Sequence, residues 1–122
     1  MVGRSLRDQE RSLVRVLLGG GPTAAAYLSR LEEYAVEDMD DGGMGSILFV
    51  GSHPNSNREL GVELGAAEFT DSDGIFVLVY LNADNFGELY EMEIWKGTGT
   101  PVISYPNPED LRPLGGSSSS RR

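Results

Sequence analysis

Apolar and polar positions follow distinct periods along the chain, and the clearest pattern is an unbroken apolar run at residues 75–81. This run of seven, IFVLVYL, is rich in β-branched and aromatic residues and has turn-forming residues on both sides. It is too short for a typical helix and suits a strand with both faces buried. Residues 88–95 alternate instead, and one face of this second strand carries Glu91, Glu93 and Trp95. The pattern predicts a hairpin at the centre of a sheet.

Helical periodicity precedes these strands. Residues 5–18 place apolar side chains at helical spacing, with Ser5 as the predicted N-cap, and residues 23–34 show a second apolar stripe. The glycine triplet at 19–21 lies between them. It lacks the Gly-Lys-Ser/Thr signature and a preceding strand, so we interpret it as a helix connection and not as a phosphate-binding loop.

Shorter strand patterns surround the central hairpin, at residues 35–39, 47–50, 60–64 and 101–105, the last as an edge strand. Glycines in the third of these either weaken the strand or mark a bulge near Gly65. Two helices followed by about five strands predict an α+β fold, in which the helices pack on a mainly antiparallel sheet. The central run offers apolar residues to both faces, so the tail and loops, or another chain, must cover the second face. We expect a homodimer through that face.

Length and composition predict the number of domains and the cellular compartment. The 122 residues suffice for a single core, and the composition changes after residue 106 to proline, glycine and serine. We therefore expect one domain at 1–106 and a disordered tail at 107–122. The chain has no cysteine, its first residues lack the apolar core of a signal peptide, and no apolar run is long enough for a membrane span. A soluble, cytoplasmic protein without a membrane partner is expected.

The charge distribution narrows the class of partner. The net charge is −9, but residues 32–93 contain fifteen acidic residues against one base, Arg58, and so carry −14. Such a surface repels the phosphates of nucleic acids and anionic lipids, because binders of those partners depend on Lys and Arg. Acidity also simply keeps small domains in solution. Among macromolecular partners, the charge favours a basic protein and excludes nucleic acid.

Aspartates gather in two loops, at Asp38, Asp40 and Asp41 and then at Asp71 and Asp73. An EF-hand loop requires a carboxylate at its twelfth position, whereas counting from the first aspartate of each loop reaches Phe49 and Asn82. We interpret both loops as hairpin turns. A divalent-metal site where the two loops meet, in a metal-binding module or a metal-dependent enzyme, is the alternative hypothesis, and no cofactor is predicted.

Candidate catalytic groups are few. His53 is the only histidine, and no nucleophile-elbow pattern accompanies it. Glu91 and Glu93 could serve as a pair of acid and base carboxylates, but on an exposed strand they are more typical of ordinary surface. An enzyme is therefore the less favoured class, and no catalytic residue is predicted.

Trp95 is the more informative residue, because it shares a strand face with Glu91 and Glu93. It is either a cap on the core or the aromatic anchor of a binding surface with an acidic rim. The predicted binding residues combine this strand with the two aspartate loops: Asp40, Asp41, Asp71, Asp73, Glu91, Glu93 and Trp95.

Four stretches carry a resemblance to a known family: Met39–Ser46 with its DGGMGS sequence, Asp71–Gly74, Glu91–Lys96 and Tyr105–Pro106. Together they resemble a family of small bacterial proteins of unknown function, over most of the chain up to Pro106, and the resemblance implies no activity. In size and charge the chain is also similar to immunity proteins, which present carboxylates to the basic active site of a toxin. This analogy favours a non-catalytic, immunity-like or antitoxin-like binder of a basic protein, although fold-level analogy does not establish function.

Overall fold

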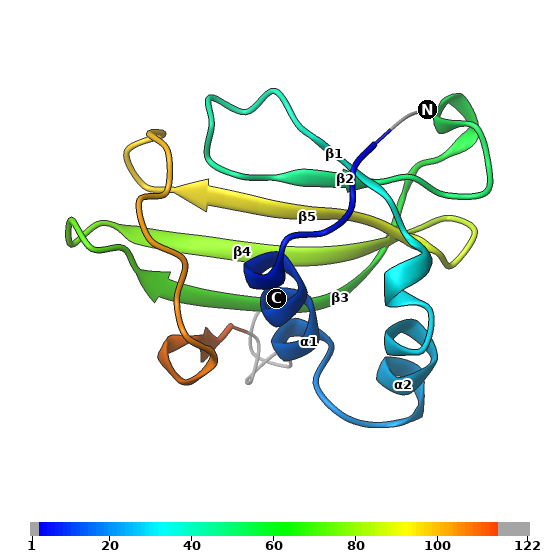
Figure 1. The fold of residues 1–122 in the computed structure, drawn as a ribbon, viewed down its shortest axis with the longest axis horizontal. Helices are drawn as coiled ribbons and strands as arrows, with labels where there is room; N and C mark the ends of the chain where they lie inside the picture. The colour runs from blue at the N-terminus through cyan, green and yellow to red at the C-terminus, as the bar shows by residue number, and fades with distance from the viewer. Residues whose placement is uncertain (1–2, 115–122) are drawn as a thin grey trace.

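The computed structural model describes residues 3–114, which form two helices and one six-stranded sheet (Figure 1). None of the described helices is long and apolar enough to cross a lipid bilayer. The elements in chain order are α1 (Asp8–Leu18), α2 (Pro22–Leu28), η1 (Leu31–Glu33), β1 (Val36–Asp38), β2 (Ile47–Phe49), η2 (Asn55–Asn57), β3 (Leu60–Thr70), β4 (Phe76–Asp84), β5 (Leu89–Lys96), η3 (Pro108–Asp110) and β6 (Arg112–Pro113).

The strands lie in the order β1-β2-β5-β4-β3-β6, and each pair is antiparallel. β4 and β5 form a hairpin with two strands on either side, which confirms the predicted central hairpin. The α+β fold with a mainly antiparallel sheet is also confirmed, with six strands where about five were expected. Register shifts in β3, between Leu60 and Glu63 and between Glu63 and Gly65, agree with the predicted bulge.

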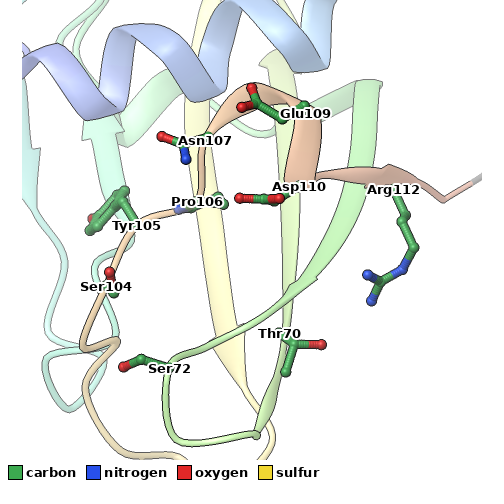
Figure 2. Close-up of a pocket in the computed structure, with 9 residues that line it drawn as sticks. All are labelled: Thr70, Ser72, Ser104, Tyr105, Pro106, Asn107, Glu109, Asp110 and Arg112. Carbon is green, nitrogen blue, oxygen red and sulfur yellow. The ribbon is translucent and has the colours of Figure 1, made fainter.

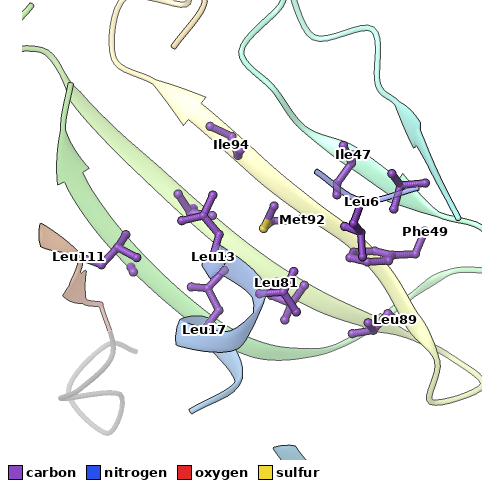
Figure 3. Packing of buried hydrophobic residues seen from close by; sticks show 14 of the residues in the cluster. Leu6, Leu13, Leu17, Ile47, Phe49, Leu81, Leu89, Met92, Ile94 and Leu111 are labelled. Atoms are coloured by element: carbon purple, nitrogen blue, oxygen red, sulfur yellow. The ribbon is translucent and has the colours of Figure 1, made fainter. Parts of the chain in front are cut away.

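The core lies between α1 and one face of the sheet. Leu13 and Leu17 of α1 point at β4 and β5, where Leu81, Met92 and Ile94 meet them (Figure 3). These residues recur at helical spacing on α1 and at every second position on the strands, so each element buries one face. The second helix belongs to the same layer, because its Tyr27 and Leu28 pack against this core.

Gly65 lets α1 approach β3 closely. A Cβ atom at this position would collide with the backbone carbonyl of Leu17, near the C-terminal end of α1. The glycine that interrupts the apolar pattern of β3 therefore serves helix–sheet packing.

Both helices are shorter than the sequence patterns suggest. α1 begins at Asp8 and not after Ser5, because the Glu10 carboxylate accepts the Arg7 N–H at 2.7 Å and thereby fixes the first turn. α2 ends at Leu28, and the following Ser29 hydroxyl donates to the Ala26 carbonyl at 2.9 Å. A separate 3₁₀ helix, η1, follows at Leu31–Glu33.

The predicted edge strand at 101–105 is wrong. The N–H groups of Ile103 and Ser104 donate to the Asp71 carboxylate, at 2.8 and 3.0 Å, and not to a neighbouring strand. The sheet edge is formed by β6, which pairs with Ala67 and Glu68 of β3.

Residues 107–114, which the composition places in a disordered tail, contain η3 and β6 in the structure. Leu111 lies between these two elements and is buried in the core cluster. Burial of this apolar residue and the pairing of β6 with β3 together hold the segment in place. The rest of the predicted tail, 115–122, lies outside the described residues.

Candidate binding surface

The face of the sheet opposite α1 is left open by both helices. Its central residues, here named the open sheet face, are Phe76, Leu78 and Tyr80 of β4 and Glu91, Glu93 and Trp95 of β5. Trp95 is 42% exposed and Phe76 is 47% exposed. Their ring centroids lie 5.7 Å apart with the ring planes inclined at 57°. Two large aromatic side chains thus form one exposed cluster.

Strand register explains why this cluster is continuous. Leu78 lies opposite Trp95, and Tyr80 lies opposite Glu93, so the residues of the 75–81 run that do not enter the core meet the polar face of β5. Leu78 and Tyr80 are half-buried, which places an apolar floor between the exposed rings and the glutamates. Contiguous exposed apolar surface with a polar rim is typical of interaction sites.

Charge is uncompensated on this face. The Glu91 carboxylate accepts a hydrogen bond from the Asn82 amide at 3.1 Å, but within residues 3–114 neither Glu91 nor Glu93 has an ion-pair partner. Partial burial raises the pKa of Glu93, and the neighbouring charge of Glu91 raises it further. A cation at this position would relieve both effects.

The raised pKa predicts a stability change in Glu93→Gln. A carboxyl whose pKa is higher in the folded than in the unfolded protein destabilises the fold when it is ionised. We therefore expect Glu93→Gln to raise the free energy of unfolding at pH 7 by about 0.2–0.5 kcal/mol, a small value because solvent screens the side chain. The gain should vanish at pH 3, where the carboxyl is protonated in both states. Urea unfolding at the two pH values measures it.

Glu109→Gln is the matched control, because Glu109 is an exposed carboxylate in η3, away from the sheet pairings of β4 and β5. It should leave stability unchanged at both pH values. A loss of stability in Glu93→Gln at pH 7 would contradict the repulsion between Glu91 and Glu93.

A hollow of about 280 Å³ adjoins the open sheet face on the side of β3. Tyr80, Asn82 and Glu93 line it from the central hairpin, and Leu60, Gly61 and Glu63 line it from β3. Pockets for drug-sized ligands usually exceed about 300 Å³. This hollow is therefore suited to a single side chain of a larger partner, and two glutamates border it.

Asp71 and Asp73 lie in a different environment, around the buried Lys96. The Lys96 ammonium donates to Asp71 at 2.8 Å and to Asp73 at 2.7 Å, and the side chains of Lys96 and Asp71 are fully buried. Burial alone would raise the pKa of Asp71, but the ammonium and three backbone N–H groups lower it far below its ordinary value. Lys96 thus supplies the cation for this aspartate loop.

Asp41 is engaged by its own loop. Its carboxylate accepts the N–H groups of Gly43, Met44 and Ser46 at 2.9–3.2 Å, which closes the DGGMGS turn. Asp40 next to it is exposed. The two aspartate loops therefore direct their carboxylates at different partners, and residues 3–114 contain no group of three or more His, Cys, Asp or Glu side chains that could hold a metal ion.

Of the seven predicted binding residues, the structure brings together Glu91, Glu93 and Trp95 on one surface. A model for a family described as a domain of unknown function, DUF6984, matches residues 3–106, which include that surface and both aspartate loops. The chain belongs to the DUF6984 family. This membership confirms the resemblance to a domain-of-unknown-function family. Comparisons of the DUF6984 chain with curated proteins and with solved structures returned no match.

A polar hollow of about 510 Å³ lies elsewhere on the DUF6984 domain, between the end of β3 and the segment 104–112 (Figure 2). Glu109 and Asp110 supply its carboxylates, while the Arg112 side chain extends away from the other labelled residues. Arg112 instead lies 3.5 Å from Glu68. No nucleophile paired with a base is found among the residues that line this hollow.

The single histidine of the DUF6984 domain stacks on Phe86, with ring centroids 3.6 Å apart. Ser52 and Glu88 lie beside it, but the Ser52 hydroxyl donates to Glu88 at 2.7 Å, and its distance to the His53 ring nitrogen is 3.5 Å. Glu88 approaches the same ring nitrogen, Nδ1, at 3.6 Å, whereas a catalytic triad places its serine and its carboxylate at opposite ring nitrogens.

Sequence reasoning missed the structural role of Arg58, which is buried against Asp84. Its guanidinium donates to Asp84 at 2.8 Å and to the carbonyls of Phe49 and Leu89 at 2.7 and 2.8 Å. One signal was available in the sequence of this DUF6984 protein. Arg58 is the lone base in a strongly acidic segment, and a lone base is a natural partner for an internal carboxylate.

Proposed function

We propose that this DUF6984 protein is a non-catalytic binding domain whose open sheet face docks a basic protein. The observation that carries the proposal is the exposed pair Trp95 and Phe76 beside two glutamates that lack a cationic partner within residues 3–114. Aromatic anchors with a charged rim are typical of protein interfaces, and the aromatic residues among them often dominate the binding energy.

The charge of the surrounding surface supports a basic partner. Arg58 is the only base between residues 32 and 93, and its side chain is fully buried against Asp84. The segment therefore contributes no exposed Lys or Arg. Arginines from outside it pair with four of its carboxylates, those of Glu32, Glu33, Asp38 and Glu68, whereas Glu91 and Glu93 have no such partner within residues 3–114. Such a field accelerates association with a cationic protein and makes it sensitive to salt.

The class of partner that fits best is a toxin or nuclease with a basic active site, because such a site carries the cations that this face lacks. In this role the domain resembles an immunity protein or antitoxin, at the level of size, charge and a carboxylate-rimmed face. The aspartate loops contribute through Asp40, which is exposed, through Asp41, and through the one negative charge that Asp71 and Asp73 together retain after pairing with Lys96.

The homodimer predicted from the apolar central run is the rival occupant of this face. A two-fold symmetric contact places the same patch on both subunits. Glu91 and Glu93 would then meet an equally acidic patch, and like charges brought together at an interface are destabilising. The basic partner is therefore the occupant that we favour, and sedimentation across a dilution series distinguishes the two.

The test uses Trp95, which is the only tryptophan and lies on the proposed interface. Fluorescence titration with a panel of purified basic nuclease toxins should change its emission. The double variant Glu91→Lys/Glu93→Lys should weaken the binding of a panel member by roughly 30-fold or more, since loss of interfacial charge pairs costs about 2 kcal/mol or more.

Glu109→Lys/Asp110→Lys is the matched control, because it changes the net charge equally at η3, outside the open sheet face. It should weaken binding several-fold less. If both double variants weakened binding equally, or if no basic protein of the panel bound, the proposal would be wrong.

A further inference from the structure

One edge of β3 pairs with β4 along the strand, whereas the outer edge is paired only in part. β6 covers its outer edge at Ala67 and Glu68, and the Leu114 N–H extends this contact to the carbonyl of Ala66. Figure 1 shows β6, in red, beside the C-terminal half of β3. Within residues 3–114, no strand pairs with the outer edge of the first half, residues 60–64.

This half of β3 is exposed and apolar at its edge. Leu60 is 60% exposed and Val62 is 65% exposed. Natural sheets usually protect such an edge with lysine, proline, bulges or a covering segment. Residues 60–64 contain neither lysine nor proline, and within residues 3–114 no strand covers their outer edge, so the two register shifts are the protection found there. Their length of five residues matches an ordinary strand.

The opposite edge of the sheet is protected. β1 has only three residues, and Arg4 bridges it through two backbone hydrogen bonds to Val36, each of 2.7 Å. The contrast singles out the first half of β3 as the place where a further strand can join the sheet.

The negative charge around residues 60–64 favours a basic segment as the added strand. Glu59 and Glu63 flank the exposed apolar residues, and the hollow lined by Tyr80, Glu63 and Glu93 opens beside them. A second copy of β3 paired here would bring its own glutamates to the same place.

We propose that an extended, basic segment of a partner protein adds as a strand to residues 60–64, with one Lys or Arg side chain over the hollow at Tyr80 and Glu93. This inference rests on the proposed function and specifies how the partner is recognised. Main-chain hydrogen bonds to β3 supply affinity, and the apolar edge and acidic hollow supply selectivity for alternating apolar and basic residues.

The test uses three capped eight-residue peptides: alternating Arg and Val, alternating Glu and Val, and the Arg–Val peptide with proline at every second valine. Amide hydrogen exchange of the full chain is followed by NMR. The Arg–Val peptide should slow exchange at residues 60–64 by at least tenfold. The Glu–Val peptide should not bind, and the proline peptide should not protect the edge because it lacks the donors that a ladder requires.

Substitutions at Leu60 and Val62 are expected to leave the fold intact, because both side chains are exposed. Leu60→Lys/Val62→Lys should abolish the protection, while Leu60→Thr/Val62→Thr, which keeps strand propensity without adding charge, should retain most of it. The inference is overturned if the Glu–Val or proline peptide protects residues 60–64 equally, or if protection grows with protein concentration alone, which would indicate a second copy.

The two proposals can fail separately. If basic proteins change Trp95 fluorescence while exchange at residues 60–64 stays unchanged, strand addition is wrong and the open sheet face remains the docking site. If the Arg–Val peptide protects residues 60–64 while Glu91→Lys/Glu93→Lys leaves the binding of basic proteins unaffected, strand addition stands and docking on the open sheet face is wrong.

Discussion

Lys96→Met lowers the free energy of unfolding by about 3–5 kcal/mol, the range expected when one member of a buried ion pair is removed. The substitution leaves Asp71 fully buried without its ammonium partner, and Asp73 loses a contact of 2.7 Å. Urea unfolding followed by circular dichroism measures the change. Lys96→Met/Asp71→Asn should recover part of the loss, because no unpaired charge then stays buried.

Arg112→Met provides the exposed counterpart, since Arg112 lies 3.5 Å from Glu68 at the surface. Its cost should be below about 1 kcal/mol. Equal costs for Lys96→Met and Arg112→Met would contradict a buried ion cluster at Lys96.

The pH dependence of stability adds an independent readout of this cluster. The native pKa of Asp71 lies well below its ordinary value of 3.8, so its stabilising contribution is complete above that value and declines as the pH falls below it. In Lys96→Met the decline between pH 4 and pH 2 should be shallower, because the ammonium no longer holds the pKa down.

Arg58→Met is the second substitution with a large expected cost, again about 3–5 kcal/mol. Asp84 would keep its bonds from the N–H groups of Phe86 and Glu88, at 2.8 and 3.0 Å, but would lose its cation. The carbonyls of Phe49 and Leu89 would lose their donors as well. Urea unfolding measures the cost, and faster amide exchange at residues 86–88 would locate it in the β4–β5 turn.

Arg58→Lys separates charge from geometry. It keeps a cation, but a single ammonium cannot reproduce the fork that contacts Asp84 and two carbonyls, so an intermediate cost is expected. Arg30→Met is the exposed control, because Arg30 is a surface residue 3.4 Å from Glu33. A cost for Arg58→Met no larger than that of Arg30→Met would contradict the structural role of Arg58.

Local patterns sufficed to predict the central hairpin and the α+β class. The alternation at 88–95 reflects burial of one face of β5. The 75–81 run was interpreted as buried on both faces, whereas within residues 3–114 only one face of β4 is fully buried and Phe76 on the other is 47% exposed. The same alternation predicted the shared face of Glu91, Glu93 and Trp95. Whether that face was covered could not be predicted, because coverage depends on where α1 and α2 pack.

Long-range polar contacts account for the errors. Residues 101–105 have the composition of a strand, but a carboxylate 32 residues earlier, that of Asp71, takes the Ile103 N–H that a ladder would need. Lys96 and Arg58 look like surface residues by type, and their burial depends on aspartates brought close only by the tertiary fold. No local pattern contains this information.

The two buried ion pairs lie at opposite ends of β4. Asp71 precedes the first residue of β4 and pairs with Lys96 of β5, while Asp84 is the last residue of β4 and pairs with Arg58. Between them β4 carries apolar residues on both faces, so the alternation of β5 is the local pattern that sets the register of the pair. A slip of one residue would turn Lys96 away from Asp71 on one side and separate Asp84 from Arg58 on the other. The two charge pairs therefore add a second penalty at both ends of the hairpin, because a slipped register would leave buried charges unpaired as well as turn Glu91 and Glu93 toward the core.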